Sequence, residues 1–330
     1  MSIYKRRRVF MLFNLGESER SWLGMILLAV LYLGALVIAA VLAPPVHWLI
    51  QWWHETAPNA LTRDIEDNPF TDTYDRLRWL PTLIALPLVL KVCGLLSWRA
   101  LGVHFRGGGG RLFLGYFFLG AGMLAGVAVL QANHYGARLD GGMAFEDWVF
   151  LLAGALSGGL LIGVLEEIVF RGMAFRMIYT RFGPWLALVG TSLFFSYAHF
   201  KIPDFLWEGR TGTVDWGSGW YVAFWTLFGI TRDFNPLIFL NLFLFGMVLG
   251  ALVLRYRSLM AAVGLHAGIV AAILFYTDAT DIQNLTAGEG KLDPLWGSGG
   301  LRDGLLTTMS FVLLCILFIG AGEKSDDELI

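Results

Sequence analysis

The chain has 330 residues, of which 56% are hydrophobic and 15% are charged, and its mean hydropathy is +0.62. An ordinary soluble domain, with about a quarter of its residues charged, is therefore excluded. The formal net charge is −2 and the basic block Lys5 to Arg8 is short, so we expect no nucleic-acid partner. Cys93 and Cys315 both fall in apolar runs, which argues against a disulfide framework.

Long continuous apolar runs predict membrane-spanning helices, because each run approaches the ~20 residues that cross a bilayer as a helix. Membrane strands would instead show short alternating segments. We predict an all-α, polytopic membrane protein with about eight transmembrane helices. The predicted spans are residues 23–43, 79–98, 112–130, a run starting at 148, 184–200, 237–254, 259–276 and 305–321.

Lys and Arg are concentrated in the shorter connections between these runs, while the longer connections 44–78, 131–147, 201–236 and 277–304 are poorer in them. This positive-inside pattern predicts that the N- and C-termini are cytoplasmic. We expect an integral protein of a bacterial inner membrane, surrounded by lipid. In the loop 201–236, the apolar patch 220–230 is too short to span and is expected to lie in the interface or partly re-enter.

Pairs of glycines four residues apart predict close packing between helices, because small residues let backbones approach each other in lipid. The pairs are Gly122/Gly126, Gly154/Gly158, Gly159/Gly163 and Gly246/Gly250.

Two adjacent carboxylates, Glu166 and Glu167, end the apolar run that starts at 148. Ionisable residues inside a membrane are costly and are by default candidates for function. Glu167 and Arg171 are four residues apart, with the acid first, which favours an ion pair on one helix face. Glu166 points about 100° away and has no such partner in its own helix, so we predict that it is the reactive carboxylate and general base. The alternative is that both carboxylates only pin helices together or serve transport.

Two histidines, His199 and His266, fall within apolar runs. Gly183-Pro184 is suited to a turn between the fourth and fifth spans. Glu166 and His199 lie at similar sequence distances on either side of this turn, so an antiparallel hairpin would place them at nearly the same level. His-Glu-x-x-His and Gly-x-Gly-Asp motifs are absent, and Ser157 lacks the leading Gly of a rhomboid-type serine motif. With these motifs absent, Glu166, His199 and His266 are the remaining candidates for a catalytic site.

Three motifs in order complete the pattern: Glu166-Glu167-x-x-x-Arg171, Phe195-x-x-x-His199, and a glycine-containing helix at 245–250 leading through Ser258-Leu259 to His266. Over about residues 150–275 the chain resembles the CPBP family, the CAAX protease and bacteriocin-processing (Abi) intramembrane endopeptidases. The chain shows no internal repeat and no second domain, so we expect one integral membrane domain over 1–330. Within it, the resemblance implies catalytic helices at about 148–276, with accessory helices at 23–130 and 305–321. It also implies hydrolysis of a peptide bond in a membrane-associated protein substrate, which can be lipid-modified.

In that family the first Glu, here Glu166, activates water with help from the first His, here His199, and His266 helps to stabilise the oxyanion. The family usually has Asn four residues after the second His, where this chain has Val270. Asn241 or Tyr197 are the substitute donors that we consider. Without a donor, the chain would be a weakened enzyme, or a non-catalytic scaffold or immunity-type binding protein of the same fold.

A zinc ion held by Glu166, His199 and His266, with Glu167 nearby, is the alternative to metal-free catalysis. We favour the metal-free mechanism because Glu166 can activate water directly and no carboxylate partner is evident in the sequence for either histidine. A transporter is the third hypothesis, and the absence of repeat symmetry argues against it.

Overall fold

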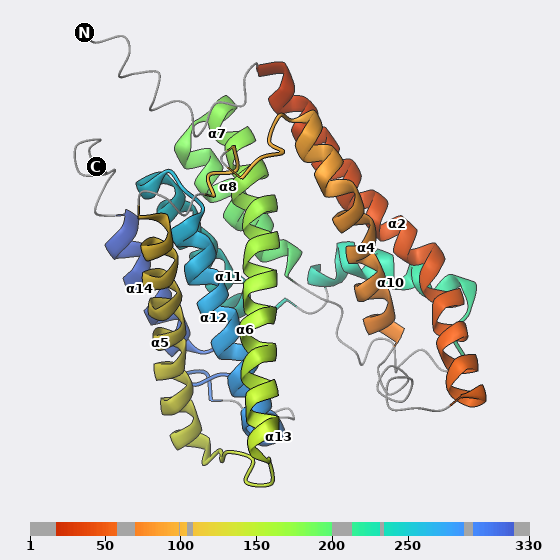
Figure 1. Ribbon diagram of the computed structural model, residues 1–330, viewed down its shortest axis with the longest axis vertical. Helices are drawn as coiled ribbons and strands as arrows, with labels where there is room; N and C mark the ends of the chain where they lie inside the picture. Colours follow the sequence, from red (N-terminus) through yellow and green to blue (C-terminus); the bar gives the residue numbers. More distant parts are fainter. Residues whose placement is uncertain are drawn as a thin grey trace. The chain divides into compact units, whose positions relative to one another are not determined.

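A computed structural model describes residues 18–57, 70–98, 100–103, 108–199, 213–231, 234–286 and 293–319. Within these ranges the chain is helical, and its extended pairing is limited to one isolated bridge between Leu139 and Thr280. The prediction of an all-α fold is therefore confirmed. The helices form two compact units, which are described separately (Figure 1). Unit 1 is built mainly from 95–196 and 235–330, and unit 2 from 22–94 and 197–234.

Unit 1 carries most of the helices. They are α5 (Gly109–Tyr135), α6 (Phe145–Glu167), the π-helical segment η1 (Ile168–Phe175), α7 (Arg176–Phe182), most of α8 (Pro184–Ala198), α11 (Pro236–Tyr256), α12 (Met260–Ala279), α13 (Ile282–Thr286) and α14 (Leu305–Ile319). The predicted turn at Gly183-Pro184 is confirmed, because α7 ends at Phe182 and α8 begins at Pro184. At the start of α11, the Asn235 side chain accepts hydrogen bonds from the backbone N–H groups of Leu237 and Ile238, which caps the helix.

Helix α12 is the centre of unit 1, with α5 and α6 packed along it and α11 packed between α12 and α14. A Cβ atom built at Gly264 would lie 2.3 Å from the Phe113 carbonyl oxygen, and one at Gly268 would lie 2.1 Å from that of Phe117. On the other side, a Cβ at Gly159 would lie 2.6 Å from the Ala267 carbonyl oxygen. Backbones this close hold α12 firmly on two sides.

The predicted glycine pairs are confirmed in part. Gly159/Gly163 contact α12, and Gly246/Gly250 contact Ser192 and Leu188 of α8. By contrast, no described atom lies within 4 Å of a Cβ built at Gly122, Gly126 or Gly154. Spacing identifies a stripe on a helix, but it does not say whether a neighbour covers that stripe.

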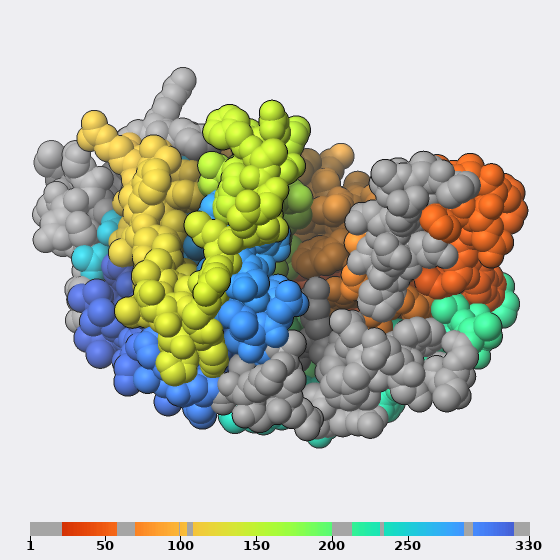
Figure 2. Space-filling model, turned by 90° about the horizontal axis from the view of Figure 1, so that it is seen from below, coloured from red at the N-terminus to blue at the C-terminus, as the bar shows by residue number. Residues whose placement is uncertain are grey.

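Connections predicted to lie on the same side of the membrane meet at the same end of unit 1. At one end, Leu139 pairs with Thr280 and the Asp281 carboxylate accepts from the Arg138 backbone N–H at 2.8 Å. Figure 2 views this end, where α5 and α6 (yellow and yellow-green) lie against the blue residues of α12 and the segment after it. At the other end, the Ser258 hydroxyl donates to the Gly102 carbonyl at 2.9 Å.

Among the described residues, five helical stretches are long and apolar enough to cross a membrane, which fits an integral membrane protein. They are Trp22–Thr56, Gly109–Tyr135, Phe145–Phe182, Pro236–Tyr256 and Met260–Ala279. α8 and α14 are shorter apolar helices, at the positions of the predicted fifth and eighth spans. α4 (Phe70–Val92) overlaps the predicted second span. The number of eight spans stays a prediction.

Unit 2 consists of α2 (Ser18–Thr56), α4, α10 (Trp216–Phe228) and the 3-10 turn η2 (Gly229–Thr231). Our expectation that the first span ends at Ala43 and is followed by a loop is wrong, because α2 continues through Pro44 and Pro45 to Thr56. Pro44 lacks the N–H that would bond to the Ala40 carbonyl. That carbonyl instead faces Gly219 of α10, where a Cβ would lie only 2.0 Å away. Such packing lets a proline-containing membrane helix persist.

Candidate active site

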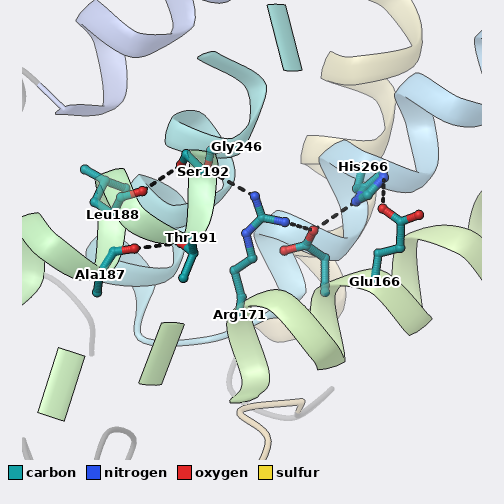
Figure 3. Close-up of polar contacts among 9 residues, drawn as sticks. Glu166, Arg171, Ala187, Leu188, Thr191, Ser192, Gly246 and His266 are labelled. Carbon is teal, nitrogen blue, oxygen red and sulfur yellow. Dashed lines mark hydrogen bonds and ion pairs between the residues drawn. The ribbon is translucent and has the colours of Figure 1, made fainter. Parts of the chain in front are cut away.

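Glu167, the last residue of α6, contacts both Arg171 and His266, which are labelled in Figure 3. Its Oε1 atom accepts a hydrogen bond from the Arg171 guanidinium at 2.8 Å, which confirms the predicted ion pair. The same oxygen lies 2.9 Å from Nδ1 of His266 on α12. Both Glu167 and Arg171 are 0% exposed. Glu167 therefore connects α6, η1 and α12 through a single carboxylate oxygen.

Arg171 extends this chain to helices α11 and α8. Its second terminal nitrogen donates to the Gly246 carbonyl oxygen at 3.1 Å, and its guanidinium carbon lies 4.6 Å from the centre of the Phe195 ring. A buried charge is tolerated when it is paired and hydrogen-bonded. Arg171 meets that requirement within η1, a π-helical segment of the kind often found at functional sites.

Glu166 faces the same histidine from the other side. Its Oε2 atom lies 3.7 Å from Nε2 of His266, and the residue is 9% exposed. The sequence predicted no partner for Glu166 within its own helix, and the structure places it beside His266 on another helix, α12. The separation exceeds a normal hydrogen bond. A water molecule bonded to both atoms would be held by Glu166 and His266 together.

The two carboxylates fix the orientation of the His266 imidazole. A carboxylate only accepts hydrogen bonds, so the short contact with Glu167 places a proton on Nδ1. Nε2 is then the nitrogen that faces Glu166. The Phe245 ring, with its centroid 5.0 Å from that of His266, and the Phe195 ring at 6.0 Å both meet the imidazole edge to face. The imidazole thus lies between two carboxylates and two aromatic rings, with its proton assigned to Nδ1.

The Glu167–His266 contact overturns one expectation from the sequence. We expected no carboxylate partner for either histidine, but Glu167 is such a partner for His266. The two residues are 99 positions apart and lie on different helices, so sequence spacing carries no signal for the contact. The role of Gly246 as an acceptor for Arg171 was missed for the same reason.

His199 follows the end of α8 and belongs to unit 2, together with Tyr197. Phe195, one helical turn earlier, is in unit 1 and contacts both Arg171 and His266. The convergence of His199 with Glu166 stays a prediction. The Tyr197 hydroxyl donates to the Leu227 carbonyl at the end of α10.

The two candidate oxyanion donors are already hydrogen-bonded elsewhere. Besides the Tyr197 contact, the Asn241 amide nitrogen donates to the Arg302 carbonyl at 2.8 Å and lies 3.4 Å from that of Gly304. Val270 lies on α12 one turn after His266 and is partly buried. Its side chain has no polar atom, so it cannot replace the amide that the family resemblance leads us to expect. The donor role of Asn241 or Tyr197 stays a prediction.

The donor types at this site suit zinc, since Glu166 and His266 offer oxygen and nitrogen ligands and Glu167 supports the histidine. A third ligand would be His199. Within the described ranges, no group of three or more His, Cys, Asp or Glu residues lies close enough together to hold a metal ion.

Comparison with known protein families gives one match. Residues 148–272 match the family model described as type II CAAX prenyl endopeptidase, Rce1-like. Searches of curated proteins and of solved structures found no match. The matched segment begins in α6 and ends in α12, and so it includes Glu166, Glu167, Arg171, His199 and His266. As the three motifs predicted, residues 148–272 of the chain are similar to the CAAX protease family, through its Rce1-like model.

Proposed function

We propose that the protein is a glutamate-type intramembrane endopeptidase that hydrolyses a peptide bond in a membrane-associated protein. The observation that supports this proposal is the pair of carboxylates on the two sides of His266, buried in the segment that matches the Rce1-like model. Glu166 is the partly accessible carboxylate, and Glu167 is the buried one. This asymmetry suits different roles, with Glu166 facing water and substrate and Glu167 orienting the histidine.

Glu166 acts as the general base in the proposed reaction. It takes a proton from water while the water oxygen attacks the carbonyl carbon of the scissile peptide bond. The resulting oxyanion is stabilised by His266, which can donate from Nε2 when both of its nitrogens are protonated. The carbon–nitrogen bond then breaks, and Glu166 returns the proton to the departing amine. His199 assists Glu166 in these proton transfers if the two residues converge as predicted.

The test is Glu166→Gln, which preserves the shape of the side chain but removes the base. The assay uses the full-length protein in liposomes with two quenched fluorescent peptides, one ending in a farnesylated CAAX motif and one without the lipid. General base catalysis contributes about 10²–10⁴-fold, so we expect at least a ~100-fold loss of cleavage with an unchanged unfolding temperature. Cleavage by Glu166→Gln at the wild-type rate would refute the proposed role.

Metal dependence is tested separately. We propose that the reaction needs no metal, so wild-type protein treated with chelator, and shown by elemental analysis to lack zinc, should keep its full rate. Loss of cleavage on zinc removal, with recovery after zinc is added back, would favour the zinc site formed by Glu166, His199 and His266.

A second candidate function rests on Val270, which leaves this helix turn without the amide donor of the family. The chain would then be a non-catalytic binding protein of the same fold. Val270→Asn distinguishes the two functions. If the chain is a weakened peptidase, this variant should raise the cleavage rate, since one oxyanion donor is worth about 10²–10³-fold. If wild type and Val270→Asn are both inactive on both peptides, the binding role is favoured.

A further inference from the structure

Helix α10 has no charged side chain over its whole length, Trp216–Phe228. Polar groups are concentrated at its start, where the Ser218 hydroxyl donates to the carboxylate of the exposed Asp215 at 2.9 Å and accepts from the Asp215 backbone N–H at the same distance. At the other end, the Gly229 N–H bonds to the Trp225 carbonyl. The backbone N–H and C=O groups of α10 are therefore hydrogen-bonded within the helix, as a segment inside a bilayer requires.

One face of α10 packs directly against α2, within unit 2. Gly219 meets the Ala40 carbonyl, as described above. Val222 and Ala223 join a buried cluster that contains Leu36 and Ala39 of α2. Figure 1 shows α10 lying across α2. This contact fixes the position of α10 along the axis of α2, a helix that is long and apolar enough to span the membrane.

The contacts also show that α10 is inclined along α2. Just before α10, the Val214 carbonyl accepts from the Trp48 indole at 3.0 Å. Farther along α10, Gly219 meets Ala40, and Val222 and Ala223 belong to the buried cluster that includes Leu36. At 1.5 Å per residue, Ala40 lies about 12 Å and Leu36 about 18 Å from Trp48 along the α2 axis. Both lie inside the apolar run that ends at Ala43. α10 thus starts outside this run and continues alongside it.

α10 exposes four large aromatic side chains spaced four residues apart, of which Trp216, at its start, also packs edge to face on Trp48 of α2. Trp216 is 62% exposed, Trp220 50%, Phe224 53% and Phe228 49%. A contiguous stripe of this kind needs a partner. The neighbouring exposed side chains of α2, such as Val37 at 47%, belong to the lipid-facing surface of a membrane span. The packing of α10 against this span favours acyl chains as the partner of its exposed aromatic side chains.

We propose that α10 is a re-entrant helix embedded in the hydrocarbon layer, with its aromatic stripe, Trp216, Trp220, Phe224 and Phe228, in contact with lipid acyl chains. This inference is independent of the proposed peptidase activity. It favours the re-entrant alternative for this segment over a passive helix lying flat in the interface. The deeper end of α10 is hydrogen-bonded to the segment that carries His199, because the Leu227 carbonyl accepts a hydrogen bond from the Tyr197 hydroxyl.

The test measures depth in the membrane by spin labelling. Single cysteines replace Trp216, Trp220, Phe224 or Phe228 in full-length protein that carries Cys93→Ser and Cys315→Ser. The labelled proteins are reconstituted in phosphatidylcholine vesicles, and accessibility to oxygen and to a water-soluble nickel chelate is compared. Trp52→Cys, at an exposed site beyond the apolar run, and Val37→Cys, at an exposed site within it, serve as matched controls.

We expect depth to increase from position 216, near the Trp52 control, to position 228, near the Val37 control. Equal shallow depths at all four positions would overturn the proposal, as would free access of the nickel chelate to positions 224 and 228. A second variant tests the tie to Tyr197. Tyr197→Phe should increase the mobility of a label at position 228 and leave a label at position 216 unchanged, and unchanged mobility at both would refute the tie.

Discussion

Glu167 is the residue on which the buried charges of the candidate site converge. Gln at this position would leave the guanidinium of Arg171, which is 0% exposed, without its carboxylate. Removing one partner of a buried ion pair costs about 3–5 kcal/mol. We therefore predict that Glu167→Gln strongly lowers the unfolding temperature in detergent, measured by the fluorescence of a thiol-reactive dye or by circular dichroism.

Glu166→Gln is the matched control for Glu167→Gln, because it makes the same change at the adjacent residue. Glu166 lies 3.7 Å from His266 and is not in the Arg171 ion pair, so its substitution should change stability little while it removes activity. Equal unfolding temperatures for the two variants would show that Glu167 does not have the structural role assigned to it.

Residue patterns predicted part of this site. The Glu167–Arg171 pair could be predicted because both residues lie on one helix at a fixed spacing. His266 and Glu166 could be named because ionisable groups are rare in apolar runs. The contact of His266 with both carboxylates could not be predicted, because it depends on how α12 packs against α6.

At the scale of elements, Gly163 sets how closely α6 approaches α12 beside the site. A Cβ at Gly163 would lie 2.9 Å from the backbone nitrogen of Ala267, the residue after His266. Gly163→Ala should push the two helices apart and lengthen the Glu166–His266 separation. A misplacement of about 1 Å can cost about 10²-fold in rate, so we predict a ~10–100-fold lower cleavage rate in the peptide assay.

Gly154→Ala provides the control on the same helix, since no described atom lies within 4 Å of a Cβ there. It should keep the wild-type rate. If both alanine variants cleave equally well, the close approach at Gly163 does not position the carboxylates. The sequence predicted that both Gly154 and Gly163 are packing residues. The structure distinguishes them, because α12 contacts only Gly163.

At the scale of the whole molecule, both the sequence and the structure indicate which connections between helices lie on the same side of the membrane. Charge distribution predicted which connections share a side, and the contacts within unit 1 agree, since Leu139 meets Thr280 and Ser258 meets Gly102 at opposite ends. The path of the chain from α2 to α5 is a separate property of the fold. It depends on whether α4 crosses the membrane.

α4 is not one of the five described stretches that are long and apolar enough to cross a membrane. It is a helix of 23 residues, but Asp72, Asp75, Arg76 and Arg78 lie in its first half and Lys91 at its end. The run predicted from sequence, 79–98, is shifted relative to the observed helix, Phe70–Val92. If α4 crosses, α4 and α5 together return the chain to its starting side, so position 55 after α2 and position 141 after α5 face the same compartment.

We predict that Glu55→Cys and Gly141→Cys both react with a membrane-impermeant maleimide in intact cells, whereas Arg181→Cys at the end of α7 reacts only after permeabilisation. All three positions are exposed, and Cys93 and Cys315 are replaced by serine in each variant. Labelling of only one of positions 55 and 141 would mean that α4 does not cross and that the count of eight spans is wrong. Labelling of position 181 alone in intact cells would reverse the orientation but keep α4 as a span, because positions 55 and 141 would still share a compartment.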